Sequence, residues 1–158
     1  MVTRPIDRLR ELGYELPPAP PPMASYVPTR LVPLGDGRSL LYVAGQVPIR
    51  DGQLLTGRVP DEVPVEQAQD AARVCALNIL AQIEASAGLE NVDQIAQLIG
   101  FVRSTDDFGD HPTVVNAASD LLVEVLGEAG RHTRAAVGAN ALPRGVTVEI
   151  AAVVVVRS

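Results

Sequence analysis

The chain ends in a β-branched segment that constrains its fold more than any other feature. Residues 145–157 read G-V-T-V-E-I-A-A-V-V-V-V-R. Such a run suits a strand that is buried on both faces, and it is too short to cross a bilayer. Glu149 lies in its middle, and burying a carboxylate without a partner costs several kcal/mol. We therefore expect a cation, a set of hydrogen bonds or a wet cleft beside it. Arg144 and Arg134 are the nearest upstream cations.

Five strands and two long helices are predicted, and their alternation indicates the fold class. The strands are expected at residues 30–34, 40–46, 94–103, 133–140 and 146–157, with turns at 36–37 and 51–52. The helices are expected at residues 64–88 and 112–130, where apolar side chains recur at helical spacing between an opening Pro and a closing Gly. Two such helices must cover one face of one sheet. We therefore predict an α+β two-layer domain of order β-β-α-β-α-β-β, with both helices on one face of a mixed sheet.

The first 28 residues differ from the rest of the chain. A short helix is expected at residues 5–13, and five prolines within residues 17–22 then exclude regular helix or central strand. Leu16, Met23 and Tyr26 give this segment apolar surface to bury. We predict a proline-rich arm over residues 1–28 that docks on the body or on a neighbouring subunit, and a domain over residues 29–158. A disordered tail is the alternative.

Composition excludes several kinds of chemistry. All 13 positive side chains are Arg, so neither a Schiff-base lysine nor a P-loop lysine is present. The net charge of −6 disfavours nucleic acid as a partner. Two His, one Cys and no metal-ligand spacing predict no metal site. We find neither a signal peptide nor a membrane span, so a cytoplasmic location is expected. Cys75 lies on the apolar stripe of the first long helix and is predicted to be a core residue.

Three motifs resemble one known family. Residues 134–150 read R-A-A-V-G-A-N-A-L-P-R-G-V-T-V-E-I, residues 41–48 read L-Y-V-A-G-Q-V-P, and residues 100–117 contain F-V-R-S-T-D-D-F followed by V-V-N-A. Together they resemble the RidA/YjgF family of enamine/imine deaminases, also labelled endoribonuclease L-PSP. The resemblance covers the chain from about Ser39 to its end, with the N-terminal arm as an extension.

The resemblance implies a chorismate-mutase-like fold, a homotrimer with clefts between subunits, and a hydrolase that needs no cofactor. It implies that the enzyme deaminates reactive 2-imino or 2-enamino acids to 2-keto acids and ammonia. Arg134 would hold the substrate carboxylate in a two-pronged pair. Glu149 would orient water and move protons as water adds to the C=N carbon.

Four further residues are carried over as substrate-binding residues. Gly45 would let the backbone approach a ligand closely, although a strand bulge would also favour Gly. The family's counterpart of Asn116 lies near the intersubunit cleft, and Tyr26 resembles the aromatic residue that closes the ligand pocket. Ala136 stands where some members have Cys. Their alternative roles are a solvent-facing helix residue for Asn116 and an anchor of the arm for Tyr26.

Departures from the family pattern keep two other functions open. Ala44 and Ala136 remove possible hydroxyl and thiol contacts from the cleft, so the protein could bind a small carboxylic acid without turnover. A ribonuclease is disfavoured by the acidic charge and by the lack of a His pair. His132 lies two residues before Arg134 and could tune pH dependence, but such a residue is more often an exposed loop histidine, and we keep it out of the catalytic set.

Overall fold

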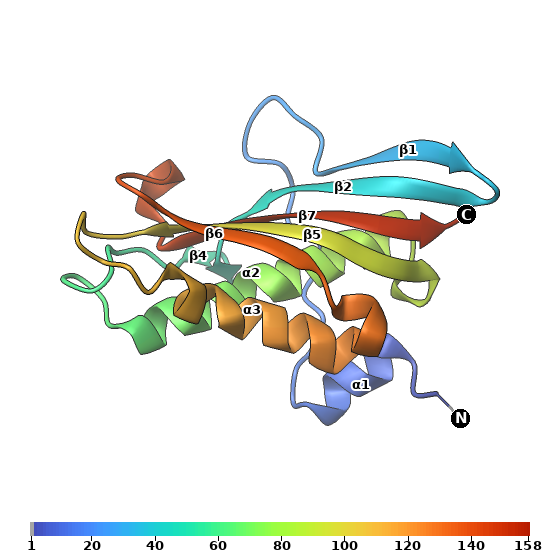
Figure 1. The fold of residues 1–158 in the computed structure, drawn as a ribbon, viewed down its shortest axis with the longest axis horizontal. Coiled ribbons are helices and arrows are strands. Elements are labelled where there is room, and N and C mark those ends of the chain that lie inside the picture. The colour runs from blue at the N-terminus through green and yellow to red at the C-terminus, as the bar shows by residue number, and fades with distance from the viewer. Residues whose placement is uncertain (1) are drawn as a thin grey trace.

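The computed structural model describes residues 2–158 and shows a two-layer domain in which long helices cover one face of a sheet (Figure 1). The five strands of this sheet lie in the order β1-β2-β7-β5-β6. The helices and strands are α1 (Pro5–Glu11), β1 (Thr29–Gly35), β2 (Arg38–Gln46), β3 (Ile49–Arg50), β4 (Gln53–Leu54), α2 (Val65–Ser86), β5 (Val92–Arg103), α3 (His111–Leu126), β6 (Thr133–Ala139) and β7 (Val148–Arg157). Three 3-10 turns are η1 (Leu89–Asn91), η2 (Gly127–Gly130) and η3 (Pro143–Gly145).

The predicted order of the main elements is confirmed, and so is the mixed sheet. β5 and β6 are parallel and are joined through α3, whereas all other neighbours in this sheet are antiparallel. Asp36 and Gly37 both have positive φ, as a tight hairpin turn requires. The hairpin β3–β4 around the turn at 51–52 is an addition to the predicted order, because its two-residue strands are too short to show periodicity.

The apolar stripes of both long helices form the core against the sheet. On α2 the stripe includes Cys75, Ile79 and Ile83, all fully buried, and on α3 it includes Leu122 and Val125. Burial raises the pKa of the Cys75 thiol, whose Sγ lies 3.7 Å from the Val148 carbonyl of β7. The prediction that Cys75 is a core residue is therefore confirmed.

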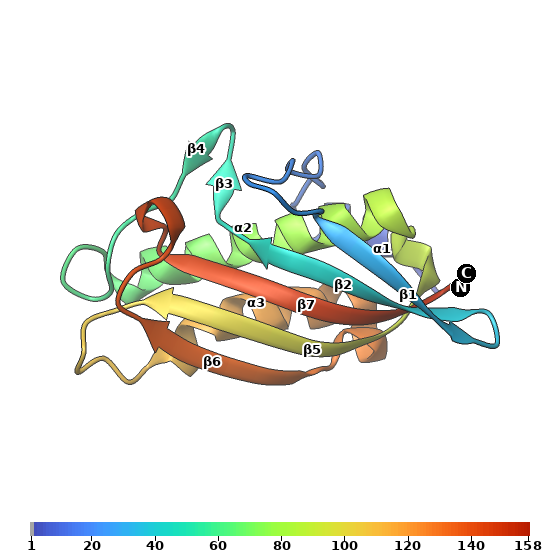
Figure 2. The same cartoon turned by 90° about the horizontal axis from the view of Figure 1, so that it is seen from above.

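The second face of the sheet carries no helix layer (Figure 2). Residues of β7 alternate between buried and half-buried along the whole strand, because every second side chain points away from the helices. The expectation that this strand is buried on both faces is therefore wrong within one chain. The open face is nevertheless apolar: Tyr42, which pairs with Val153, is 48% exposed, and Val137 is 44% exposed.

The N-terminal segment packs against the body of its own chain. Leu9 of α1 is fully buried within the main core, and the Arg8 Nε–H donates a hydrogen bond to the Glu124 carbonyl of α3 at 3.2 Å. The segment then runs to the edge of β2, where the Ala44 N–H donates a hydrogen bond to the Pro28 carbonyl at 2.9 Å. The division of the chain at residue 28 stays a prediction. Within residues 2–158, every helix is too short or too polar to cross a bilayer.

Candidate functional site

The structure divides the six predicted site residues into two groups on opposite sides of the sheet. One group lies at the edge strand β6 and the neighbouring helix α3. The other lies at the end of β2, on the open face of β7 and in the N-terminal segment. The first group is Arg134, Asn116 and Ala136, and the second is Glu149, Gly45 and Tyr26.

Arg134 of β6 points toward α3, where uncharged oxygen atoms hold it. Its Nη1 donates to the Asn116 Oδ1 at 2.8 Å and to the Ser119 Oγ at 3.1 Å, and its Nη2 donates to the Pro112 carbonyl at 3.4 Å. Within residues 2–158 its Nε–H has no hydrogen-bond partner and the guanidinium makes no ion pair. One N–H on Nε and one on Nη2 are therefore left. Two adjacent donors of this kind suit the two oxygens of a carboxylate.

Asn116 and Ala136 support this arrangement in different ways. Asn116 lies in the first half of α3, is exposed, and has its side-chain oxygen committed to Arg134. Ala136 is two residues beyond Arg134 on β6, so it lies on the same face of the sheet, where it packs against the core. Its methyl group places no polar atom beside the guanidinium of Arg134.

Two further residues at this site were not among the predicted set. Ser119 Oγ lies 2.9 Å from His132 Nε2, and His132 Nδ1 lies 2.6 Å from the Gly130 carbonyl. Burial, opposed by the Gly130 hydrogen bond, lowers the pKa of His132, and the charge of Arg134 lowers it further. Ser119 follows Asn116 by three residues on a helix, and this spacing could have placed both on one face.

Glu149 lies on the open face of β7, opposite Phe101 of β5. It is half-buried, and burial raises the pKa of its carboxyl. Among the described residues it has neither an ion-pair nor a side-chain hydrogen-bond partner. The two cations expected beside it, Arg134 and Arg144, therefore do not pair with it in a single chain.

Strand register explains why Arg134 and Glu149 are apart. Arg134 pairs with Leu98 of β5, which is fully buried under the helices, and Glu149 pairs with Phe101 of the same strand. Leu98 and Phe101 are three residues apart, so their side chains point to opposite faces. The sheet thus lies between the guanidinium and the carboxylate, and one small ligand cannot contact both within one chain.

Gly45 lies directly against Glu149. A Cβ atom at Gly45 would lie 3.0 Å from the Glu149 Cδ and Oε1 atoms, closer than an ordinary contact allows. The pairing of β2 with β7 shifts register between Val43 and Gln46, so Gly45 occupies an irregular stretch of the strand. The register shift fits the bulge considered for Gly45, and the close contact here is with the side chain of Glu149. The approach of a ligand to this backbone stays a prediction.

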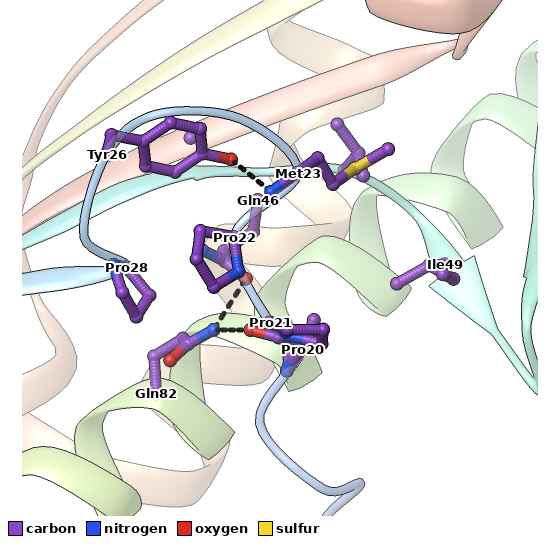
Figure 3. Close-up of a pocket in the computed structure, with 11 residues that line it drawn as sticks. Pro20, Pro21, Pro22, Met23, Tyr26, Pro28, Gln46, Ile49 and Gln82 are labelled. Atoms are coloured by element: carbon purple, nitrogen blue, oxygen red, sulfur yellow. Dashed lines mark hydrogen bonds between the residues drawn. The ribbon is translucent and has the colours of Figure 1, made fainter.

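Tyr26 and Gly45 line one small cavity between the N-terminal segment and the end of β2 (Figure 3). The cavity has a volume of about 120 Å³. Tyr26 Oη accepts a hydrogen bond from the Met23 N–H at 3.3 Å, and Gln82 of α2 donates to the Pro20 carbonyl at 2.7 Å. Pro22 lies between Tyr26 and Gln82 in this view, and Pro20 and Pro21 also line the cavity, so the arm itself forms a wall of it. Residues 2–158 contain no group of three or more His, Cys, Asp or Glu that could hold a metal ion.

These features define a two-layer α+β protein in which, over residues 2–158, an arginine without an ion pair lies at one sheet edge and a carboxylate without an ion pair lies on the opposite face. Residues 6–152 match the model of a family described as "YjgF/chorismate_mutase-like, putative endoribonuclease". The chain belongs to this family, which confirms both the resemblance in the motifs and the chorismate-mutase-like fold.

Individual relatives support the same assignment. Protein TCP17 of Trypanosoma cruzi is 40% identical over 149 residues, which are 92% of this chain and 90% of that protein. The crystal structure of Atu1372 from Agrobacterium tumefaciens is 44% identical with a TM-score of 0.86, covering 96% of this chain and 92% of that one. E. coli TdcF, solved with bound serine, is 27% identical with a TM-score of 0.63, covering 89% and 94%.

Proposed function

We propose that this protein hydrolyses reactive 2-imino or 2-enamino acids to 2-keto acids and ammonia, at a site that two copies of the chain build together. The observation that carries the proposal is the state of Arg134. Its guanidinium is fixed by three uncharged oxygen atoms, has no counter-ion within the described residues 2–158, and keeps one N–H on Nε and one on Nη2 for a ligand.

Arg134 is the proposed anchor of the substrate carboxylate. A charge-assisted hydrogen bond contributes about 1.5–3 kcal/mol, so a two-pronged pair gives useful affinity for a molecule of amino-acid size. Serine, the molecule bound in the TdcF structure, also carries a carboxylate beside a carbon–nitrogen bond. Asn116 orients the guanidinium, and Ala136 leaves the surface below it free of polar groups.

Glu149 is the proposed acid and base. On the protonated imine form of the substrate, ionised Glu149 takes a proton from water as the water oxygen bonds to the C=N carbon, and it gives this proton to the nitrogen of the adduct. The C–N bond then breaks to release ammonia, while the new hydroxyl group loses its proton to Glu149 and becomes the carbonyl of the 2-keto acid. Burial raises the pKa of Glu149, which brings it closer to neutral pH and makes these transfers easier. Gly45 permits the close approach of the backbone, and Tyr26 closes the neighbouring cavity.

Assembly would bring the two halves together. Each chain offers an edge strand, β6, that carries Arg134, and an open apolar face that carries Glu149. An apolar face of this kind calls for a covering partner. A homotrimer, as the family resemblance implies, would place β6 of one copy near the open face of the next, with one site at each of its interfaces. We propose a cytoplasmic enzyme of this form that needs no cofactor, because the C=N bond is already electrophilic.

A carboxylate-binding protein without turnover is the second candidate. It is favoured by one observation. All three hydrogen bonds that hold Arg134 are made within a single chain, whereas Glu149 lies on the far side of the sheet. This candidate predicts that 2-keto acids bind and that 2-aminoacrylate is not turned over faster than in buffer.

Mixing two inactive variants tests the proposal. Arg134→Ala loses the carboxylate anchor and Glu149→Gln loses the proton carrier, so each alone should lose turnover of freshly generated 2-aminoacrylate by roughly 10²-fold or more. In mixed trimers formed by unfolding and refolding an equal mixture, about a quarter of the interfaces combine one intact Arg134 with one intact Glu149. Activity should then return to about a quarter of the wild-type value.

The controls separate assembly from chemistry. Arg73→Ala removes another arginine that makes no ion pair among residues 2–158, and it should keep wild-type turnover. Light scattering should give three times the chain mass of 16.7 kDa for every variant. Recovery of no activity in properly assembled mixtures would show that one chain supplies both groups or that neither acts, and the two-chain site would be abandoned.

A further inference from the structure

Ser119 connects the proposed carboxylate anchor to a histidine. Its Oγ lies 3.1 Å from Arg134 Nη1 on one side and 2.9 Å from His132 Nε2 on the other. His132 is held in turn by the Gly130 carbonyl, 2.6 Å from Nδ1. Three successive hydrogen bonds therefore run from β6 through α3 to η2.

The direction of each hydrogen bond follows from the Gly130 carbonyl, which can only accept. His132 Nδ1 must therefore carry a proton, and in the neutral ring Nε2 must then be an acceptor. The Ser119 hydroxyl donates its one proton to Nε2, which leaves the Oγ lone pairs for Arg134. Neutral His132 thus fixes Ser119 in the orientation that accepts from the guanidinium. When the ring takes up a proton, Nε2–H donates to one lone pair of the Ser119 Oγ and the other lone pair still accepts from Arg134, so the contact with the guanidinium is kept in both protonation states.

We propose that Ser119 and His132 are positioning residues for Arg134, which aim its free N–H groups at a carboxylate, and that His132 takes up a proton when the carboxylate binds. The inference rests on the proposed role of Arg134 and adds the device that holds and regulates it. Arg134 has four rotatable side-chain bonds, so an anchor fixed in advance loses less entropy when a ligand binds.

The proton coupling follows from the charges around His132. Arg134 faces it from β6, Asp120 of α3 shares its shallow surface hollow, and Arg131 is paired with Glu128 at 3.2 Å. From β5, the neutral side chain of Gln94 reaches the backbone beside it.

The charge of Arg134 is one of the causes that lower the pKa of His132. A bound carboxylate offsets that charge, so the pKa of His132 rises on binding. By linkage, the carboxylate then binds more tightly as the pH falls through the pKa of His132.

The chain contains a matched control for a purely structural Ser–His hydrogen bond. Ser104 Oγ lies 3.0 Å from His111 Nε2, near the other end of α3. Ser104 is 5% exposed and makes no hydrogen bond to Arg134. Ser104→Ala therefore removes an equivalent hydrogen bond and leaves the anchor untouched.

Calorimetry with pyruvate, the simplest 2-keto acid, tests the positioning role. Ser119→Ala should weaken pyruvate binding by about 10- to 150-fold, as the loss of a hydrogen bond to a charged group predicts. Ser119→Thr keeps the hydroxyl and should restore most of the affinity, and Ser104→Ala should bind as wild type does. Equal affinity in wild type and Ser119→Ala would overturn the inference alone. Failure of wild type itself to bind pyruvate would overturn it together with the proposed carboxylate site.

Proton NMR of the histidine rings tests the coupling without any activity measurement. The chain has only two histidines, so His111 serves as the internal reference. The pKa of His132 should rise when pyruvate saturates the wild-type protein. It should also rise in Arg134→Ala, where pyruvate should have no further effect. A His132 pKa that stays unchanged while pyruvate is bound to the wild-type protein would refute proton uptake at this residue.

Discussion

Gly45→Ala changes the position of one carboxylate and little else. A Cβ at residue 45 would meet three atoms of Glu149, with Cδ and Oε1 at 3.0 Å and Cγ at 3.1 Å. The φ of Gly45 lies outside the left-handed region, so alanine can adopt the backbone conformation found there. The three heavy atoms nearest to the added methyl group thus all belong to the side chain of Glu149.

The magnitude follows from those contacts. Ordinary carbon contacts begin near 3.5 Å, so the carboxylate must move by roughly half an ångström. Replacing glycine in an accessible conformation stabilises by about 0.4–1 kcal/mol, whereas overpacking costs about 1–3 kcal/mol. Together these two contributions change the free energy of unfolding too little to unfold the protein. A catalytic group misplaced by about 1 Å can lose about 10²-fold in rate, so a displacement of half that size should lower kcat by roughly tenfold.

The assay is coupled detection of the 2-keto acid formed from 2-aminoacrylate. Gly109→Ala is the control, because a Cβ there meets nothing within 4 Å and the φ of Gly109 is also outside the left-handed region. Gly45→Ala combined with Glu149→Asp shortens the acid by one methylene and relieves the contact, so the two changes should be strongly non-additive. Wild-type kcat in Gly45→Ala would show that the position of Glu149 does not matter for turnover.

Three other predictions concern the core, the pH dependence of turnover and the stability of a Glu149 variant. Leu9→Ala should lower the free energy of unfolding by about 2–5 kcal/mol in urea titrations, because Leu9 is fully buried, and a loss below about 0.5 kcal/mol would mean that α1 is not anchored there. Burial raises the pKa of Glu149, so kcat/KM should rise with pH through a limb above the ordinary glutamate range, and Glu149→Gln should remove this limb. The same raised pKa means that stability is greater while Glu149 is protonated and falls as the pH rises through its pKa. Glu149→Gln should therefore be at least as stable as wild type at pH 7, and a lower unfolding midpoint would indicate a structural partner for the carboxylate.

The fold could be predicted because its signals are local. The stripe on α2 that contains Cys75 and Ile79 has helical spacing, and the β-branched run of β7 is unmistakable in the sequence. Two helices and five strands in this order bury their apolar faces most simply when both helices pack on one face of the sheet. The hairpin β3–β4 was not predicted, because two-residue strands are too short to show periodicity.

The sequence indicates individual candidate residues for the site, but it does not show how they are placed relative to one another. The motifs indicate Arg134 and Glu149 as candidates, but the face on which each lies depends on which residue of β5 it pairs with. A shift of one residue in that register would move a side chain to the other face, and nothing in the sequence of one strand reveals its neighbour's register. The contact between Ser119 and His132 could not be predicted for a related reason, since it depends on how α3 lies over the end of β6.

The separation of Arg134 from Glu149 has a chemical consequence. A guanidinium and a carboxylate on one face of adjacent strands would pair with each other, which would lower the pKa of the acid and occupy the N–H groups that a substrate needs. The sheet prevents this within a chain: among residues 2–158, Arg134 has only uncharged partners, and the carboxylate of Glu149 has neither an ion-pair nor a side-chain hydrogen-bond partner. In the proposed assembly the two groups meet across an interface, where the spacing between subunits can leave room for a substrate between them. The carboxylate of that substrate would then pair with Arg134 while Glu149 keeps the raised pKa that proton transfer requires.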